Sequence, residues 1–421
     1  MRKMRSVIFG LGAVLAVPSA WAAGFQLNEF SAAAQGRANA GETAMTDTAA
    51  SLARNSAVMG NFEGSSISIV YHYINPEVDV KGKLNNGTDA SKKDIAPTAH
   101  IPGFYYIQGI DDKWAVGLSL NSHFGLATDY GNSYGGSEFA NETSIKTYYL
   151  TPHVSFKPTE SLSLGLGLSY IHGVGKIKNT GPNSLATLPP PVSGLAGQTL
   201  MEVEGDGDAF GYTVGLLWNA DENTRVGFSY RSRVDLKLKG DIKQFDLMSG
   251  VVLKNKGDLT LNLPEVYELG VAHDLNDTFT LMGGLQKTGW HRFKELKGKS
   301  HGQVVFQKDE NWRDAYRVSA GAEWHVIEML TLRGGIAYDE SPVENDDRSL
   351  SIPDAARKWF TLGATLDLGK GGSIDAAFSY LNGNKESVNE ESAISSPALD
   401  FQGGLSKTDA FIYSIGYNIS F

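Results

Sequence analysis

The fold class of this chain is decided by its last stretch, Phe411-Ile412-Tyr413-Ser414-Ile415-Gly416-Tyr417-Asn418-Ile419-Ser420-Phe421. Aromatic and aliphatic side chains occupy the odd-numbered positions, and small or polar ones occupy most of the even-numbered positions. Successive side chains of a β-strand point to opposite faces, so this stretch has one apolar face. A strand of about ten such residues can cross a bilayer with its apolar face toward lipid. We therefore expect the last strand of a transmembrane antiparallel β-barrel, which closes against the first.

The same alternation recurs along the chain. Its clearest example is 162–170, where leucines and a tyrosine alternate with serines and glycines. Such runs predict strands with one apolar face. Including a poorer run at 101–108, we expect fourteen strands, which contain residues 67–73, 101–108, 114–120, 148–156, 162–170, 210–218, 226–230, 259–271, 279–281, 316–324, 330–338, 360–366, 374–380 and 411–421.

The connections between these runs alternate strictly between short and long. Short polar turns occur at 111–113, 157–160, 220–223, 274–277, 326–328 and 369–372. Long spacers occur at about 75–99, 131–143, 177–209, 239–257, 293–311, 339–356 and 382–408. Short periplasmic turns and long external loops are typical of outer-membrane barrels. A soluble β-sandwich also has alternating strands, but it would not usually place Gly-rich faces opposite aromatic faces fourteen times.

Other properties of the sequence limit the class of protein. Residues 1–22 combine a basic start, an apolar stretch and the motif Ala20-Trp21-Ala22, which predicts a secretory signal peptide. The rest of the chain has no run of about 18 apolar residues, so we expect no spanning helix. Cysteine is absent and the formal net charge is −10, so we expect no disulfide, no nucleic-acid partner and no metal or other cofactor.

Residues 23–62 do not follow the strand pattern. They begin with Gly24-Phe25-Gln26-Leu27-Asn28-Glu29-Phe30 and continue as a stretch rich in Ala, Gly and Thr. A barrel of fourteen strands is too wide for wall side chains alone to fill. We therefore expect this segment to lie in the lumen as a plug, or hatch. The predicted division of the chain is signal peptide 1–22, hatch 23–62 and barrel 63–421.

Short motifs spread over the chain carry a resemblance to a known family. The start Ala23-Gly24-Phe25-Gln26-Leu27-Asn28-Glu29-Phe30-Ser31 resembles that of the FadL family of outer-membrane long-chain fatty acid transporters. Other matching motifs include Asp94-Ile95-Ala96-Pro97-Thr98-Ala99, Phe124-Gly125-Leu126-Ala127-Thr128, Thr260-Leu261-Asn262-Leu263-Pro264-Glu265 and Ser349-Leu350-Ser351-Ile352-Pro353-Asp354. The resemblance implies a monomeric fourteen-stranded barrel in the bacterial outer membrane, in contact with outer-membrane lipid and lipopolysaccharide.

The resemblance also implies a route for passive uptake. External loops capture a long-chain fatty acid, an internal apolar site holds it, and it leaves sideways at an inward kink of the third strand. The kink corresponds to Phe124, Gly125 and Leu126, and an isolated Gly in a strand favours a bend. Burial of a chain of about sixteen carbons gains roughly 0.8 kcal/mol per CH₂. Transfer into the membrane core therefore needs no energy source.

The resemblance assigns the ligand head group to basic residues, because a buried carboxylate needs a cation or hydrogen-bond donors. Lys308 matches the family position that contacts the carboxylate, and Phe25 is expected near the internal site. The family's second basic contact corresponds here to Asn179. Lys176 and Lys178, within three residues of it, are the candidate replacements.

The hatch departs from the family at one motif. Asn55-Ser56-Ala57 stands where the family typically has Asn-Pro-Ala. Loss of the fixed φ of proline removes one restraint on that turn. A gating role for these residues is therefore a hypothesis.

Three other functions remain open. The same architecture can carry another hydrophobic molecule, such as an aromatic hydrocarbon, and the change at Asn179 keeps this open. The barrel could instead be an ion-conducting porin. An esterase barrel is the enzymatic alternative, but neither Gly-x-Ser-x-Gly nor His-Glu-x-x-His occurs, so we expect no enzyme.

Overall fold

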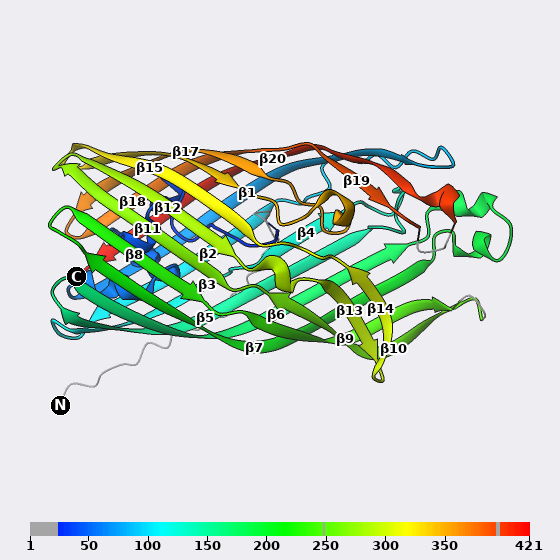
Figure 1. Cartoon of the computed structure of the whole chain (residues 1–421), viewed down its shortest axis with the longest axis horizontal. Coiled ribbons are helices and arrows are strands. Elements are labelled where there is room, and N and C mark those ends of the chain that lie inside the picture. The colour runs from blue at the N-terminus through cyan, green and yellow to red at the C-terminus, as the bar shows by residue number, and fades with distance from the viewer. Residues whose placement is uncertain (1–23, 247–248, 393–395) are drawn as a thin grey trace, which may run out of the picture.

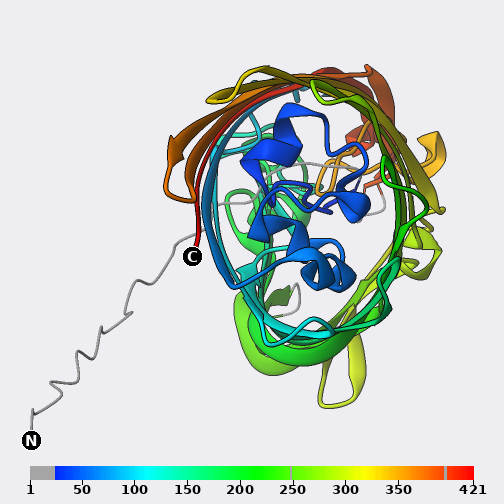
Figure 2. The ribbon, with the colours of Figure 1, turned by 90° about the vertical axis from the view of Figure 1, so that its left-hand side faces the viewer.

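The computed structural model describes residues 24–246, 249–392 and 396–421, so the expected signal peptide lies outside the described residues. The chain forms one closed ring of tilted strands (Figures 1 and 2). The β segments are β1 (Ser65–Leu84), β2 (Ala99–Gly109), β3 (Trp114–Asn121), β4 (Gly125–Asp129), β5 (Glu142–Thr159), β6 (Leu162–Thr180), β7 (Thr199–Asn219), β8 (Thr224–Arg231), β9 (Val234–Asp246), β10 (Val251–Leu263), β11 (Val266–Asn276), β12 (Phe279–Thr288), β13 (Glu295–Ser300), β14 (Gln303–Asp309), β15 (Ala315–Ile327), β16 (Leu330–Asp339), β17 (Arg357–Gly369), β18 (Gly372–Gly383), β19 (Glu386–Glu390) and β20 (Phe401–Ser420).

These segments of the described chain build fourteen wall strands. Four wall strands are interrupted, and each consists of two segments: β3 with β4, β8 with β9, β10 with β11, and β18 with β19. β13 and β14 form an additional hairpin beside β10. β1 pairs antiparallel with β20 over residues 66–84, which closes the ring. The predicted all-β barrel of fourteen antiparallel strands is confirmed. The predicted runs fall within strands, except that 259–271 spans the two segments of one strand and 411–421 extends one residue past β20.

The terminal strand has the two faces that its sequence predicts. Tyr413, Ile415 and Tyr417 are 44–54% exposed, whereas Ser414 and Asn418 are 6–7% exposed. The outward side chains would face lipid, where apolar groups are favourable, and the inward ones face the lumen. Alternation of side-chain chemistry therefore encodes the two sides of the wall.

Aromatic side chains mark both edges of the apolar band. Next to the short turns, the rings of Phe279 and Trp324 stack with centroids 5.7 Å apart. Farther along the strands, the ring centroid of Tyr230 lies 5.9 Å from that of Tyr212 and 4.9 Å from that of Tyr267. Aromatic girdles at the two interfaces are typical of strand-built membrane barrels.

Several expected loops are strand instead. The spacer predicted at 239–257 consists mostly of β9 and β10, which remain paired along their length. Their outward side chains are charged, so the apolar alternation ends although the ladder continues. Ion pairs join the two strands, Lys237 to Asp258 at 3.2 Å and Lys256 to Asp241 at 2.6 Å. Cross-strand pairs of opposite charge stabilise a sheet outside lipid. The prediction of a loop at 239–257 was wrong because it relied on apolar alternation, which these two strands lack.

The helices of the described ranges are short. They are α1 (Ala32–Gly36), η1 (Glu42–Ala44), η2 (Ala49–Ala53), η3 (Ser56–Asn61), η4 (Asn183–Thr187), η5 (Val192–Leu195), η6 (Trp290–Arg292), η7 (Asn345–Asp347) and η8 (Pro397–Leu399). None of these helices has the length and apolar character needed to span a bilayer.

Residues 24–62, here called the N-terminal segment, lie inside the ring (Figure 2). α1 packs against β17 and β18, η1 against β8 and β11, η2 against β1 and β2, and η3 against β5, β6 and β7. Glycines allow this close approach: a Cβ added at Gly363 of the wall would meet the Cα of Gly36 at 2.7 Å. The N-terminal segment therefore contacts strands around the whole ring.

Candidate functional site

The third wall strand is broken where the sequence predicts a kink. Within the ladders of the described chain, β3 pairs with both β2 and β5, whereas β4 pairs with β5 alone. Residues 99–103 of β2 pair with β1 and, among the residues that the structure describes, have no ladder partner on their other edge. The wall therefore has an unpaired seam between β2 and β4.

β4 is turned toward the lumen. Leu126, Ala127 and Thr128 are all less than 8% exposed, without the alternation of a lipid-facing strand. The Thr128 hydroxyl donates to the carbonyl of Ser351 at 3.3 Å, and Ser351 belongs to an external spacer. Contacts of β4 with this spacer replace the ladder that β4 would otherwise form with β2.

The N-terminal segment pairs with the break. The Leu27 N–H donates to the His123 carbonyl and the Gly125 N–H donates to the Phe25 carbonyl, both at 2.8 Å. These two bonds form an antiparallel bridge between Gln26 and Phe124. Residues 25–27 are therefore attached to the break that borders the seam.

Phe25 lies at the centre of an aromatic cluster. Its ring centroid is 4.6 Å from Trp290, 5.3 Å from Phe293, 5.7 Å from Trp312 and 6.0 Å from Phe124. All five side chains are at most 2% exposed. The arrangement offers an apolar, aromatic environment between the N-terminal segment and the broken strand. It is the chemistry that a hydrocarbon chain or an aromatic ring requires.

Lys308 lies beside the same apolar core, because it donates to Ser351 between Leu350 and Ile352 of that core. The Trp312 indole N–H donates to Glu310 at 3.2 Å, two residues from Lys308. Lys308 Nζ donates to Ser351 Oγ and to Glu390 Oε1, each at 2.8 Å. Burial raises the pKa of Glu310 to about 7, although Lys308 opposes the rise. An ammonium beside an apolar core is suited to an amphipathic ligand.

The other proposed cations lie elsewhere. Outward positions of β6 are even-numbered, as the exposed Leu164, Leu166 and Leu168 show. Lys176 and Lys178 share that face, and Lys176 pairs with Glu142 at 2.6 Å. The structure therefore does not bring these lysines to the interior with Lys308.

Asn179 and the Asn55-Ser56-Ala57 turn make local hydrogen bonds. The Asn179 amide donates to the Glu138 carbonyl at 2.9 Å, in an external loop. Asn55 accepts from the Ala57 N–H at 2.9 Å and caps η3. Ser56 Oγ lies 2.8 Å from His153 Nδ1 on the wall. Hydrogen bonds thus restrain the turn that lacks proline.

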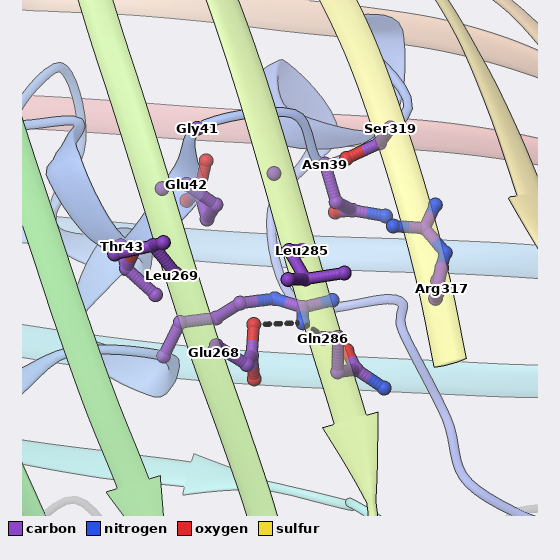
Figure 3. Close-up of a pocket in the computed structure, with 13 residues that line it drawn as sticks. Asn39, Gly41, Glu42, Thr43, Glu268, Leu269, Leu285, Gln286, Arg317 and Ser319 are labelled. Atoms are coloured by element: carbon purple, nitrogen blue, oxygen red, sulfur yellow. Dashed lines mark hydrogen bonds and ion pairs between the residues drawn. The ribbon is translucent and has the colours of Figure 1, made fainter. Parts of the chain in front are cut away.

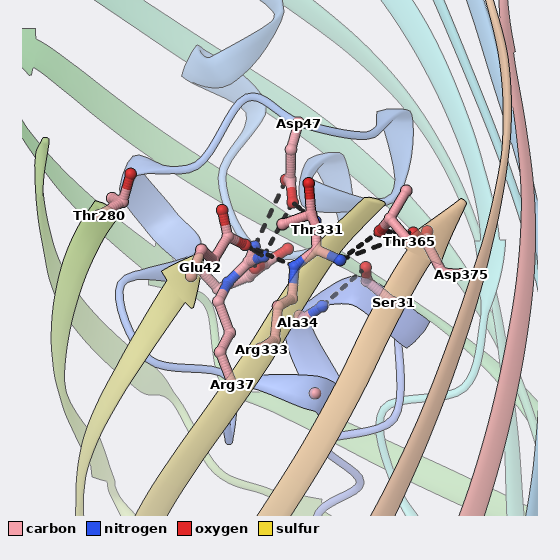
Figure 4. A network of polar contacts seen from close by, with 12 residues as sticks. Ser31, Ala34, Arg37, Glu42, Asp47, Thr280, Thr331, Arg333, Thr365 and Asp375 are labelled. Carbon is pink, nitrogen blue, oxygen red and sulfur yellow. Dashed lines mark hydrogen bonds and ion pairs between the residues drawn. The ribbon is translucent and has the colours of Figure 1, made fainter. Parts of the chain in front are cut away.

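Buried ion pairs fix the N-terminal segment to the wall. Glu268 and Gln286 line a small polar cavity (Figure 3). Arg54, which also lines it, pairs with Glu268 at 2.6 Å. Nearby, Arg37 and Arg333 belong to one polar network (Figure 4). Both pair with Glu323, Arg37 at 2.6 Å and Arg333 at 2.5 Å. Removing one partner from such a pair commonly costs about 3–5 kcal/mol.

Sequence reasoning missed five residues of this site: Trp290, Phe293, Glu310, Trp312 and Glu390. They lie in or beside spacers, where no periodicity marks a buried face. Bulky aromatics inside an otherwise polar spacer were the available signal, because such side chains rarely remain exposed.

Comparisons with known proteins agree with this architecture. The family model "Outer membrane protein transport protein (OMPP1/FadL/TodX)" matches residues 13–421. The long-chain fatty acid transport protein of Escherichia coli O6:H1 is 33% identical, over 96% of this chain and 95% of its own length. The 47 kDa outer membrane protein of Pasteurella multocida is 34% identical with the same coverage, 96% and 95%. Among solved structures, a Pseudomonas aeruginosa FadL homologue has a TM-score of 0.84 at 23% identity, covering 95% of this chain and 100% of its own. The Pseudomonas putida toluene transporter TodX has a TM-score of 0.70 at 18% identity, covering 94% and 100%.

Proposed function

Because the chain belongs to the outer-membrane transport protein family that includes FadL and TodX, we propose that it carries long-chain fatty acids passively across the bacterial outer membrane. The observation that carries this proposal is the position of Lys308. Its ammonium donates to Ser351, whose neighbours Leu350 and Ile352 belong to the same buried apolar core as Phe25 and Trp312. A carboxylate at Lys308 would leave its hydrocarbon tail in that core.

The proposed route starts at the external loops. Leu188 and Val192 of one loop are partly buried against the same apolar core. A ligand would pass from there to the core and leave through the seam between β2 and β4. Its destination is the hydrocarbon of the membrane, which it favours by roughly 0.8 kcal/mol per CH₂.

In this proposal residues 23–62 act as the hatch. The bridge between Gln26 and Phe124 would couple ligand arrival beside Phe25 to the width of the seam. The ion pairs of Arg37 and Arg54 would keep the rest of the segment in place. The barrel would then pass hydrophobic molecules sideways without an axial channel for ions.

Uptake of radiolabelled oleate tests the proposal in cells that lack their own transporter. Lys308→Ala removes a charge-assisted hydrogen bond, and we expect about tenfold lower uptake at limiting oleate. Lys176→Ala is the matched control, since its side chain faces outward and pairs with Glu142. Equal uptake by Lys308→Ala and the unmodified protein would refute the head-group assignment.

Uptake of an aromatic hydrocarbon is the second candidate. It is favoured by the charge around Lys308, where Glu310 and Glu390 already supply two carboxylates. An uncharged ring needs no cation and could use the cluster around Phe25 alone. Competition between toluene and labelled oleate for the same protein separates the two candidates.

A further inference from the structure

Lys308 is surrounded by more carboxylate than it can balance. Glu390 Oε1 lies 2.8 Å from the ammonium. Glu310 is 0% exposed, and within the described chain its Oε1 has no hydrogen-bond partner. Glu138, 5% exposed, and Asp400 add further negative charge on the side of Glu390.

No second cation offsets this charge among the described residues. There, Glu390 forms an ion pair with Lys308 alone and Glu310 forms none. Arg348 reaches the same strand as Glu390, but it pairs with Glu386 at 3.4 Å. Its guanidinium also donates to the Asp354 carbonyl at 2.9 Å. One ammonium therefore serves two carboxylates, the buried Glu310 and the partly buried Glu390.

Both oxygens of the Glu390 carboxylate accept hydrogen bonds. One oxygen accepts from Lys308, and the other accepts from the Leu350 N–H at 2.8 Å. The side chains of Leu350 and Val388 beside it are fully buried. The position that a ligand carboxylate needs is thus filled by a carboxylate of the protein itself.

We propose that Glu390 is a tethered competitor for the ligand head group and determines which head groups the site accepts. This rests on the proposed function, in which Lys308 is the head-group cation. A fatty acid anion binds only by exchanging with Glu390, whereas a ligand with an uncharged head group leaves the pair intact.

The exchange also explains how a bound anion can leave. A partly buried ammonium without a partner is costly, so a ligand paired with Lys308 alone would be released slowly. Glu390 returns to Lys308 as the ligand departs, and the ammonium stays paired throughout. Competition by Glu390 lowers the affinity for the ligand and raises its rate of release, as a transporter requires.

Binding of two ligands with the same tail tests the proposal. Oleate and oleyl alcohol are titrated by calorimetry into the purified full-length protein at a fixed alkaline pH. Glu390→Gln removes the competing charge and should bind oleate about tenfold more tightly, because a hydrogen bond to a charged group is typically worth this factor. Its affinity for oleyl alcohol should not change. Glu386→Gln is the matched control, since it removes a carboxylate of β19 that pairs with a different cation, and both affinities should stay constant.

A double-mutant cycle locates the effect at the ammonium. In a Lys308→Met background, Glu390→Gln should leave oleate affinity unchanged. Glu390→Asp keeps the charge but shortens the side chain, and it provides a second variant if Glu390→Gln does not fold. Its oleate affinity should lie between that of the unmodified protein and the tenfold higher value expected for Glu390→Gln. Unchanged or weaker oleate binding by Glu390→Gln, or by Glu390→Asp in its place, overturns the proposal. Oleate binding that is insensitive to Lys308→Met contradicts the proposed head-group site instead, so the two failures are distinguishable.

Discussion

Replacing Phe25 with alanine should detach the start of the N-terminal segment from the broken strand. Phe25 is 0% exposed and its ring contacts four aromatic side chains at centroid distances of 4.6–6.0 Å. Truncation of a fully buried Phe typically costs about 3–5 kcal/mol. The wall ladders do not include Phe25, so the cost falls on docking of residues 25–27. A loss of about 3 kcal/mol shifts the docked population roughly hundredfold.

Amide hydrogen exchange measures this docking. The Leu27 and Gly125 amides donate the two bonds of the bridge, so their exchange should accelerate by about two orders of magnitude. Exchange over η3 should not change, because Asn55 caps that helix independently. Phe25→Leu keeps most of the apolar volume and should lose much less protection. Unaltered exchange at Leu27 and Gly125 in Phe25→Ala would refute the inferred coupling.

Two further predictions concern the turn and the charge near the head-group site. Ser56→Ala removes the hydroxyl that lies 2.8 Å from His153 Nδ1, at a cost of about 1–3 kcal/mol. Amide hydrogen exchange should therefore accelerate over residues 56–61 but not over 24–27. Equal exchange rates over 56–61 in the variant and the unmodified protein would contradict this. Burial raises the pKa of Glu310 to about 7, so the folded protein holds this proton below that pH and releases it above. Affinity for an alkyl sulfonate, which stays ionised, should therefore rise as the pH falls through about 7. Glu310→Gln should abolish that dependence, and a persistent slope in titration calorimetry would show that another group controls it.

The wall could be predicted from sequence because its rule is local. Lipid on one side and the lumen on the other impose a period of two, and the terminal strand follows it from Tyr413 to Asn418. The rule ends where the strands leave the lipid. The charged outward faces of β9 and β10 therefore looked like loop although they pair along their length.

The site was only partly accessible to the same reasoning. Lys308 and Phe25 came from the family resemblance, and the structure places both beside one apolar core. The contact of Lys308 with Glu390 joins residues 82 positions apart through segments without periodicity, so no local pattern encodes it. The outward direction of Lys176 was readable, because it has the same parity as Leu164 and Leu166 of its strand.

In the proposed route the ligand leaves through the seam beside the broken strand. Asn121 pairs with Tyr149 and Gly125 with Lys146, so the break has three residues opposite two of β5. Deleting Ser122 therefore brings β3 and β4 into continuous register on β5 and would give residues 99–103 of β2 a neighbouring strand. The measurement is oleate uptake by cells that make this variant, with folding verified by its migration on unheated gels. We predict uptake at the level of cells without the transporter. A folded deletion variant that takes up oleate at the unmodified rate would contradict the lateral route.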